Sequence, residues 1–90
     1  MLYMVLEHFR ANDPRPVYKR FAERGRMLPD DVKYVSSWID TGLTRCFQLM
    51  EAPDAASLEE WMSRWRDIVD FEYCEVISSA EAAARTAKLP

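Results

Sequence analysis

Glu7 and Gln48 are the residues of this chain whose types and surroundings best fit chemistry. Glu7 follows an apolar run that starts at Leu2, and Gln48 stands between Phe47 and Leu49. If these segments are adjacent strands, both side chains point into one space. Partial loss of water there raises the pKa of a carboxyl group toward the range that general acid–base catalysis uses. The amide beside it can then hold a substrate carbonyl or phenol.

A purely structural interpretation of the same pair stays open. In it, Glu7 and Gln48 hydrogen-bond across an interface between two subunits, or Glu7 forms a salt bridge with an arginine such as Arg45. Aromatic rings nearby can stack on a planar ligand, although aromatic side chains on a sheet most often serve packing. We predict Glu7 as the candidate catalytic residue, and a substrate-binding set that consists of Glu7, Tyr34, Ser36, Trp38, Gln48 and Tyr73.

The remaining reactive side chains form no second constellation. His8 is the only histidine and falls on the predicted helix-facing side of its strand. A zinc site made of this one histidine with Cys46 and Cys74 is not expected, because the two cysteines fall on separate strands. The two cysteines fall on strands separated by a third, roughly 9–10 Å apart, which is too far for a disulfide, and we expect packed thiols. The chain has no Gly-rich phosphate loop and no G-x-S-x-G turn. We therefore expect no metal and no cofactor.

The segments that must position these side chains alternate between strand and helix patterns. Apolar runs rich in aromatic and β-branched residues predict strands at 2–10, 32–40, 45–51 and 71–77. Helical spacing and capping residues predict helices at about 14–27, from 54 or 57 to 68, and at 79–87. Asp40-Thr41-Gly42 predicts a hairpin turn with Gly42 in the left-handed conformation.

This order of elements predicts a single α+β domain over residues 1–90. Right-handed crossovers arrange a β-α-β-β-α-β chain as one four-stranded antiparallel sheet with strand order 4-1-3-2, and both helices lie on one face. This is the ferredoxin-like arrangement, to which the terminal helix is added. The segment at 45–51 is then a central strand, beside the first.

Alternation along the strands divides the sheet into two faces, and we assign the more aliphatic face to the helices. That face carries Leu2, Met4, Leu6, Val35, Ile39, Phe47, Leu49, Cys74 and Val76. The opposite face then carries Tyr3, Val5, Glu7, Tyr34, Ser36, Trp38, Cys46, Gln48, Met50, Tyr73 and Glu75. It is too apolar for open water and too polar for a dry core. Either a second subunit covers it, or two sheets enclose a ligand cavity between them.

Composition and charge argue against several classes of partner. The net charge of −3 disfavours nucleic acid, whose binders usually carry a basic stripe. No apolar run approaches the ~20 residues that a membrane span needs, and the apolar start reaches Glu7 too soon for a signal peptide. Two cysteines without CxxC spacing fit a reducing cytoplasm. An apolar fraction of 49 % is generous for a small monomer and favours a homodimer.

Six segments together resemble one bacterial family. They are 2–9 (LYMVLEHF), 34–38 (YVSSW), 45–51 (RCFQLME), 60–65 (EWMSRW), 67–72 (DIVDFE) and 79–84 (SAEAAA), and they span almost the whole chain. The family that they resemble is domain of unknown function 3303, which is similar to the dimeric α/β-barrel group. That group pairs subunits sheet to sheet and includes cofactor-free monooxygenases, chlorite-dismutase relatives and stress-response barrels. The resemblance implies a homodimer and brings no catalytic residues.

Two functions follow as expectations. The first is a small-molecule-binding dimeric barrel, a cofactor-independent monooxygenase- or isomerase-like enzyme that acts on a small hydrophobic or aromatic compound. The alternative is a non-catalytic homodimeric interaction module. An enclosed cavity next to Glu7 and Gln48 favours the first, whereas a filled, dry interface favours the second.

Overall fold

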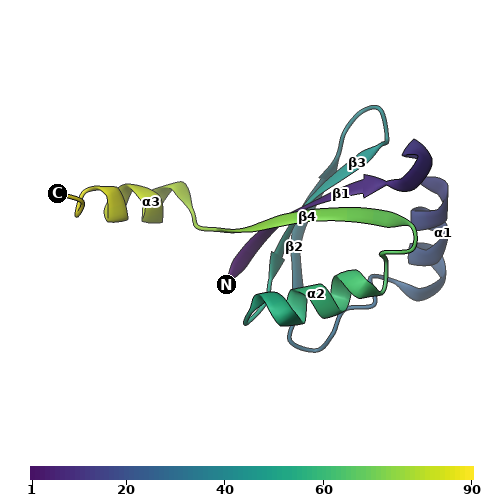
Figure 1. The fold of residues 1–90 in the computed structure, drawn as a ribbon, viewed down its shortest axis with the longest axis horizontal. Coiled ribbons are helices and arrows are strands. Elements are labelled where there is room, and N and C mark those ends of the chain that lie inside the picture. Colours follow the sequence, from purple (N-terminus) through teal and green to yellow (C-terminus); the bar gives the residue numbers. More distant parts are fainter.

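A four-stranded antiparallel sheet runs through the computed structural model, which describes residues 1–90 (Figure 1). The elements are β1 (Leu2–Phe9), the 3₁₀ turn η1 (Arg10–Asn12), α1 (Arg15–Arg24), β2 (Lys33–Ile39), β3 (Arg45–Glu51), α2 (Ala55–Ser63), β4 (Val69–Val76) and α3 (Ser79–Thr86). The strand order is β2-β3-β1-β4, which confirms the predicted ferredoxin-like α+β topology. No helix has the length and apolar character needed to cross a membrane.

The helix boundaries follow local capping signals. Asp54, one of two predicted starts of the second helix, is its N-cap, and its carboxylate accepts a hydrogen bond from the Ser57 N–H at 2.8 Å. α2 ends at Ser63, earlier than predicted, and the chain continues as a tight turn. α1 ends at Arg24, because Gly25 takes a positive φ of 67° that a glycine adopts without strain.

The hairpin between β2 and β3 differs from the prediction in its turn residue. Left-handed backbone occurs at Leu43, with a φ of 60°, and not at Gly42. The Asp40 carboxylate accepts hydrogen bonds from the backbone N–H groups of Thr44 and Arg45 at 2.9 and 2.7 Å. An acidic side chain therefore fixes this turn from its first residue, as Asp often does.

The predicted assignment of the two sheet faces is wrong for β1, β3 and β4 and for Tyr34 of β2, whereas Ser36, Trp38 and Ile39 lie on their predicted sides. The helix-covered face carries Tyr3, Val5, Glu7, Phe9, Cys46, Gln48, Met50, Tyr73 and Glu75, and the opposite face carries Leu2, Met4, Leu6, His8, Phe47, Leu49, Cys74 and Val76. Alternation separates these two sets correctly, but both sets are apolar, so alternation does not say which one the helices cover. The buried indoles of Trp61 and Trp65 share one core cluster with Val5 and Cys46 of this face.

A bulge in β2 divides the predicted binding residues between the two faces. Tyr34 lies opposite Met50, but Ser36 lies opposite the residue directly before Met50, so one residue of β2 is extra. Tyr34 therefore faces the helices, while Ser36 and Trp38 lie on the other side of the sheet. Val35, which we expected beneath the helices, is the extra residue and is 47 % exposed.

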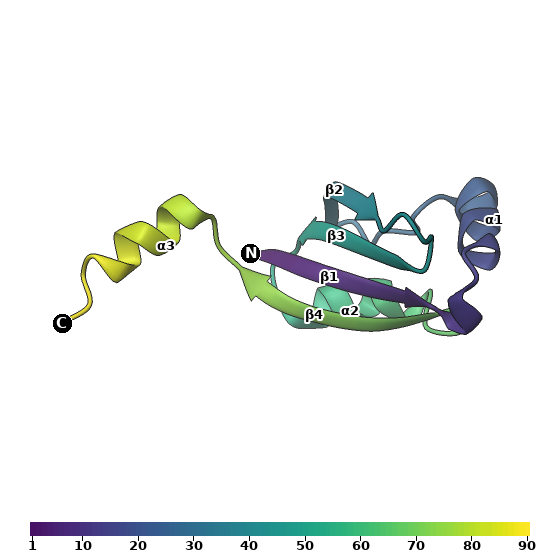
Figure 2. The same ribbon diagram turned by 90° about the horizontal axis from the view of Figure 1, so that it is seen from above.

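The side of the sheet away from α1 and α2 is uncovered, and we call it the open face. It is defined by Leu2, Met4, Leu6, Ser36, Trp38, Phe47, Leu49 and Val76. None of these side chains belongs to the buried core cluster or packs against it, and Trp38 is 59 % exposed. α3 extends beyond the end of β4, away from the sheet, and none of its residues is buried (Figure 2). The subunit thus has its core on one side and a bare apolar sheet on the other.

Candidate functional site

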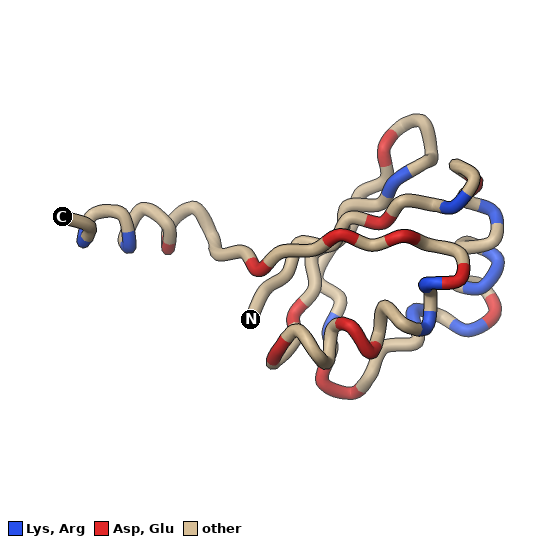
Figure 3. Tube along the Cα trace, in the orientation of Figure 1, with Lys and Arg blue, Asp and Glu red and all other residues tan.

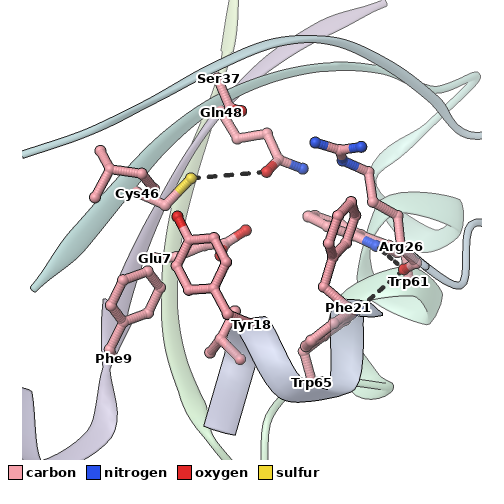
Figure 4. A pocket seen from close by; sticks show the side chains of 12 residues that line it. Glu7, Phe9, Tyr18, Phe21, Arg26, Ser37, Cys46, Gln48, Trp61 and Trp65 are labelled. Carbon is pink, nitrogen blue, oxygen red and sulfur yellow. Dashed lines mark hydrogen bonds between the residues drawn. The ribbon is translucent and has the colours of Figure 1, made fainter. Parts of the chain in front are cut away.

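A cavity of about 120 Å³ lies between the helix-covered face of the sheet and the helices. From the sheet, it is lined by Glu7, Phe9, Ser37, Ile39, Cys46 and Gln48. From the helical side, it is lined by Val17, Tyr18 and Phe21 of α1, by Arg26, and by Trp61 and Trp65 (Figure 4). Most of the lining is apolar and the few polar groups converge, which is the usual composition of a small-molecule site.

One backbone carbonyl group accepts hydrogen bonds from the two tryptophan side chains that line the cavity. Trp61 on α2 and Trp65 in the turn after it are both buried, and each donates its indole N–H to the carbonyl oxygen of Arg26 at 3.0 Å. The ring of Trp61 also packs edge-on against Phe71 of β4, with 5.8 Å between ring centroids. These contacts connect the end of α2 to the turn that follows α1.

Glu7 is the acidic group at the sheet side of the cavity. Its residue is only 7 % exposed, and its carboxyl group takes part in no hydrogen bond and no salt bridge within the chain. The protein leaves no fully enclosed side-chain oxygen or nitrogen without a partner, so the oxygens of Glu7 must reach the cavity space. Burial raises the pKa of Glu7 to about 7, and the nearby positive charge of Arg26 lowers this pKa by a smaller amount. This carboxyl group can therefore both accept and donate a proton near neutral pH.

Gln48 and Cys46 lie on β3, the strand beside the one that carries Glu7, and their side chains form only weak hydrogen bonds. The Cys46 thiol donates to Gln48 Oε1 at 3.7 Å, and Gln48 Nε2 donates to the Met50 sulfur at 3.0 Å. Burial, with the charge of Glu7, raises the pKa of Cys46 to about 12, so the thiol stays protonated and is no nucleophile. Sulfur is a poor hydrogen-bond acceptor, so the Gln48 amide has donor capacity left for a bound molecule.

Arg26 supplies the only positive charge in the cavity lining. Its guanidinium lies 3.6 Å from the ring centroid of Tyr34 and 5.0 Å from that of Phe21. It forms none of the salt bridges of the protein. In Figure 4 the guanidinium points toward the amide of Gln48. An aromatic stack therefore fixes a cation that has no anionic partner.

Tyr18 and Phe21 form the exposed part of the lining, at 48 % and 40 % exposure. Burial, followed by the nearby Cys46 and Glu7, raises the pKa of Tyr18, so its phenol remains a neutral hydrogen-bond donor. These two rings of α1 mark the mouth of the cavity.

The structure brings together part of the predicted site. Glu7 and Gln48 do share one space, as predicted, but beneath the helices of their own subunit. Tyr34 lies under Arg26, and its hydroxyl bonds to that of Ser37 at 2.8 Å. Tyr73 instead donates to Glu59 and lies outside this cavity. The other two predicted residues, Ser36 and Trp38, lie on the open face.

Several lining residues escaped the sequence analysis. Trp61 and Trp65 are buried in the core, Cys46 is a packed thiol as expected, and all three also line the cavity. Tyr18 and Arg26 were not among the predicted site residues.

The other candidate groups lie apart from the cavity. His8 is on the open face, not under the helices, with its Nε2 3.9 Å from a carboxylate oxygen of Glu72. Both cysteines are free: Cys46 is buried, whereas Cys74 is exposed on the opposite face and is not the packed thiol that we expected. No group of three or more His, Cys, Asp or Glu side chains is arranged to hold a metal ion.

Comparison with known proteins identifies the family. No curated protein and no solved structure matches the chain. One family, described as a domain of unknown function, matches from residue 1 to residue 90. Because the match covers the whole chain, this protein belongs to the domain of unknown function family DUF3303.

Proposed function

We propose that the protein binds a small molecule in the cavity beneath its helices and transfers a proton through Glu7, as an isomerase-like or cofactor-independent oxygenase-like enzyme. One observation carries the proposal: a buried carboxyl group without any protein partner reaches an aromatic cavity. Burying such a group without a hydrogen bond is costly, and functional sites are where proteins accept that cost.

The chemistry follows from the groups around the cavity. Ionised Glu7 removes a proton from the carbon next to a carbonyl: the C–H bond breaks, an O–H bond forms on Glu7, and the electron pair moves to the carbonyl oxygen. The Gln48 amide and the Arg26 guanidinium stabilise the resulting enolate. In a β,γ-unsaturated ketone, return of the proton to the γ-carbon completes an isomerisation, because the C=C bond moves into conjugation with the carbonyl group. Cofactor-independent oxygenation starts with the same deprotonation and then requires O₂ as co-reactant.

Deuterium exchange tests this role without knowledge of the natural substrate. In D₂O above neutral pD, the protein should accelerate exchange of the methyl protons of acetophenone, a small ring ketone, as followed by proton NMR. Glu7→Gln should slow this exchange about 100-fold or more, because the amide cannot accept the proton. Glu23→Gln, on the exposed side of α1, is the matched control. Equal exchange by wild type and Glu7→Gln would rule out Glu7 as the base.

The open face supports a second proposal, which is that two copies pair sheet to sheet as a dimeric α/β barrel. Its centre is apolar, and its two sides differ in charge: β4 carries Glu72 and Asp70, which pairs with Arg10, whereas on the other side Lys33 on β2 and Arg45 on β3 outnumber Glu51. A two-fold axis along the strands brings the acidic edge of one copy to the basic edge of the other. This isologous pairing makes a second copy the occupant that we propose.

Leu49→Arg should convert the dimer into a monomer. The substitution places a charge at the centre of the open face, where pairing would bury it without a partner. Sedimentation velocity at matched concentration measures the change. Ala56→Arg, on the exposed side of α2, should leave the dimer intact. A wild-type protein that sediments as a monomer over the whole concentration range would exclude sheet-to-sheet pairing.

A non-catalytic homodimer is the alternative function, and the two experiments separate it from the enzyme. It is favoured if the dimer forms while Glu7→Gln leaves deuterium exchange unchanged. In either case we infer a reducing compartment such as the cytoplasm, because Cys46 and Cys74 are unpaired and lie on opposite faces of the sheet.

A further inference from the structure

The size of the cavity limits what it can hold. An apolar protein cavity of roughly 150 Å³ accommodates benzene. The cavity beside Glu7 measures about 120 Å³ and opens at Tyr18 and Phe21. The space beside Glu7 therefore suits a single six-membered ring, whereas a second fused ring would extend out through the mouth. Its walls include the flat faces of several aromatic side chains, which favour a planar ligand.

The charge of the cavity limits the substituent. Arg26 is stacked on Tyr34 and Phe21, so its planar fork is held in place while its N–H donors remain free of acidic partners. A fixed guanidinium fork matches a carboxylate, which it binds through two parallel hydrogen bonds. α1 and the turn after it also carry a cluster of basic residues (Figure 3), of which Arg15 and Arg20 are paired with Asp13 and Asp67. Both features favour an anionic ligand.

The ionised carboxylate of Glu7 would repel a bound anion, whereas its protonated form can donate a hydrogen bond to one. The charged or titratable groups that face it are Cys46 from β3, Tyr18 from α1 and Arg26 from the turn after α1. β4 contributes the uncharged Phe71 opposite Glu7, and the α2 side contributes the two indoles. Arg26 is thus the only cation near Glu7, and a bound anion would compete with Glu7 for it.

We propose that the cavity binds a planar monocarboxylate the size of one aromatic ring, with its carboxylate on Arg26 and the amide of Gln48, and with Glu7 protonated in the complex. This rests on the proposed function of the same cavity and deepens it. The bound anion keeps Glu7 protonated, so a carboxylate held in this way meets an acid at Glu7, whereas the proton abstraction proposed above applies to a neutral ketone that leaves Glu7 ionised. Where Glu7 is ionised beforehand, binding takes up one proton from solvent.

Proton uptake gives the proposal a specific pH dependence. The pKa of Glu7 in the free protein is about 7. Below that pH, Glu7 is already protonated and the affinity for the anion is constant. Above it, the dissociation constant should rise about tenfold per pH unit, because each complex must first acquire a proton.

Calorimetry with benzoate and its neutral analogue benzamide tests the inference. At pH 6, benzoate should bind about tenfold or more tightly than benzamide, and 2-naphthoate should bind weakly. Titrations at pH 8 in buffers of different ionisation enthalpy should show an uptake approaching one proton per benzoate. Glu7→Gln should abolish this uptake but retain binding at pH 6. Arg26→Gln should lose about tenfold or more in affinity for benzoate and little for benzamide, with the exposed Arg24→Gln as the matched control.

Tryptophan fluorescence separates the possible failures. In a Trp38→Phe background, only Trp61 and Trp65 remain, and both line the cavity. Fluorescence changes with benzoate and benzamide at equal affinity would overturn the carboxylate anchor while leaving a ligand site. A complete lack of response to both compounds would overturn the ligand site as well. Arg26→Lys, which keeps the charge but not the fork, should restore part of the affinity if the folded protein loses it in Arg26→Gln.

Discussion

Glu7→Gln should raise the free energy of unfolding at pH 8 by about 3 kcal/mol, with no gain at pH 4. The pKa of Glu7 is raised from 4.5 to about 7 in the folded protein. A raised carboxyl pKa means that folding favours the protonated form, so wild-type stability is highest below the unfolded pKa. It is then lost as the pH rises from 4.5 through about 7 and stays low above that pH. Gln removes this loss because it never ionises.

Urea denaturation of wild type and Glu7→Gln between pH 4 and pH 8, at one protein concentration, measures the effect. Glu23→Gln removes an equally charged but exposed carboxylate, so its difference from wild type should stay within about 0.5 kcal/mol. Two unfolding curves for wild type and Glu7→Gln that keep a constant separation at every pH would show that Glu7 titrates normally. A stabilised but inactive variant would be the pattern of a functional site that trades stability for chemistry.

Trp61→Ala should destabilise the subunit by about 3–5 kcal/mol, the range for loss of a large buried aromatic side chain. Trp61 is 2 % exposed, packs on Phe71 and donates its indole N–H to the Arg26 carbonyl. Trp61→Phe keeps a ring against Phe71, and Trp65 still donates to the same carbonyl, so it should cost only about 1 kcal/mol.

Urea midpoints of the two variants at pH 6 separate packing from hydrogen bonding. The matched control is Trp38→Ala in a Leu49→Arg background, where the open face has no partner. Trp38 is 59 % exposed, so this change should cost less than about 1 kcal/mol. If Trp61→Phe proved as damaging as Trp61→Ala, the bond to Arg26 would outweigh the ring packing.

Sequence patterns predicted the order of elements well because the signals are local. Asp54 caps α2 as one of the two predicted starts, although glycine at position 25 ends α1 earlier than the predicted Met27. Right-handed crossovers then leave essentially one arrangement of four strands. Each of these rules uses only neighbouring residues or chain direction.

The choice of the covered face is a tertiary question that alternation does not answer. Both faces of β1 and β3 are apolar, so the pattern is equally compatible with either. The covered face is the one whose residues share a core cluster with Trp61 and Trp65, among them Val5 and Cys46. No glycine or proline marks the bulge at Val35 in the sequence. Because of this bulge, Tyr34 faces the helices and not the open face.

The central pair of the site was predictable despite this error. Glu7 and Gln48 have the same parity on adjacent strands, so they share a face whichever face the helices cover. Arg26 and Tyr18 were not predictable in the same way. Their approach to Glu7 depends on how α1 and its following turn fold back toward the sheet, which no local pattern encodes.

The two hydrogen bonds to the Arg26 carbonyl restrict which parts of the cavity wall can move. The residue that presents the cation is held through its own backbone to both indoles, at 3.0 Å each. That section of the wall moves only if both bonds break together. Ligand entry then depends on the rim formed by α1, where Tyr18 and Phe21 are exposed. Movement of α1 would thus limit the rate at which a ligand enters and leaves. The Arg26 guanidinium and the two indoles would keep their positions relative to one another.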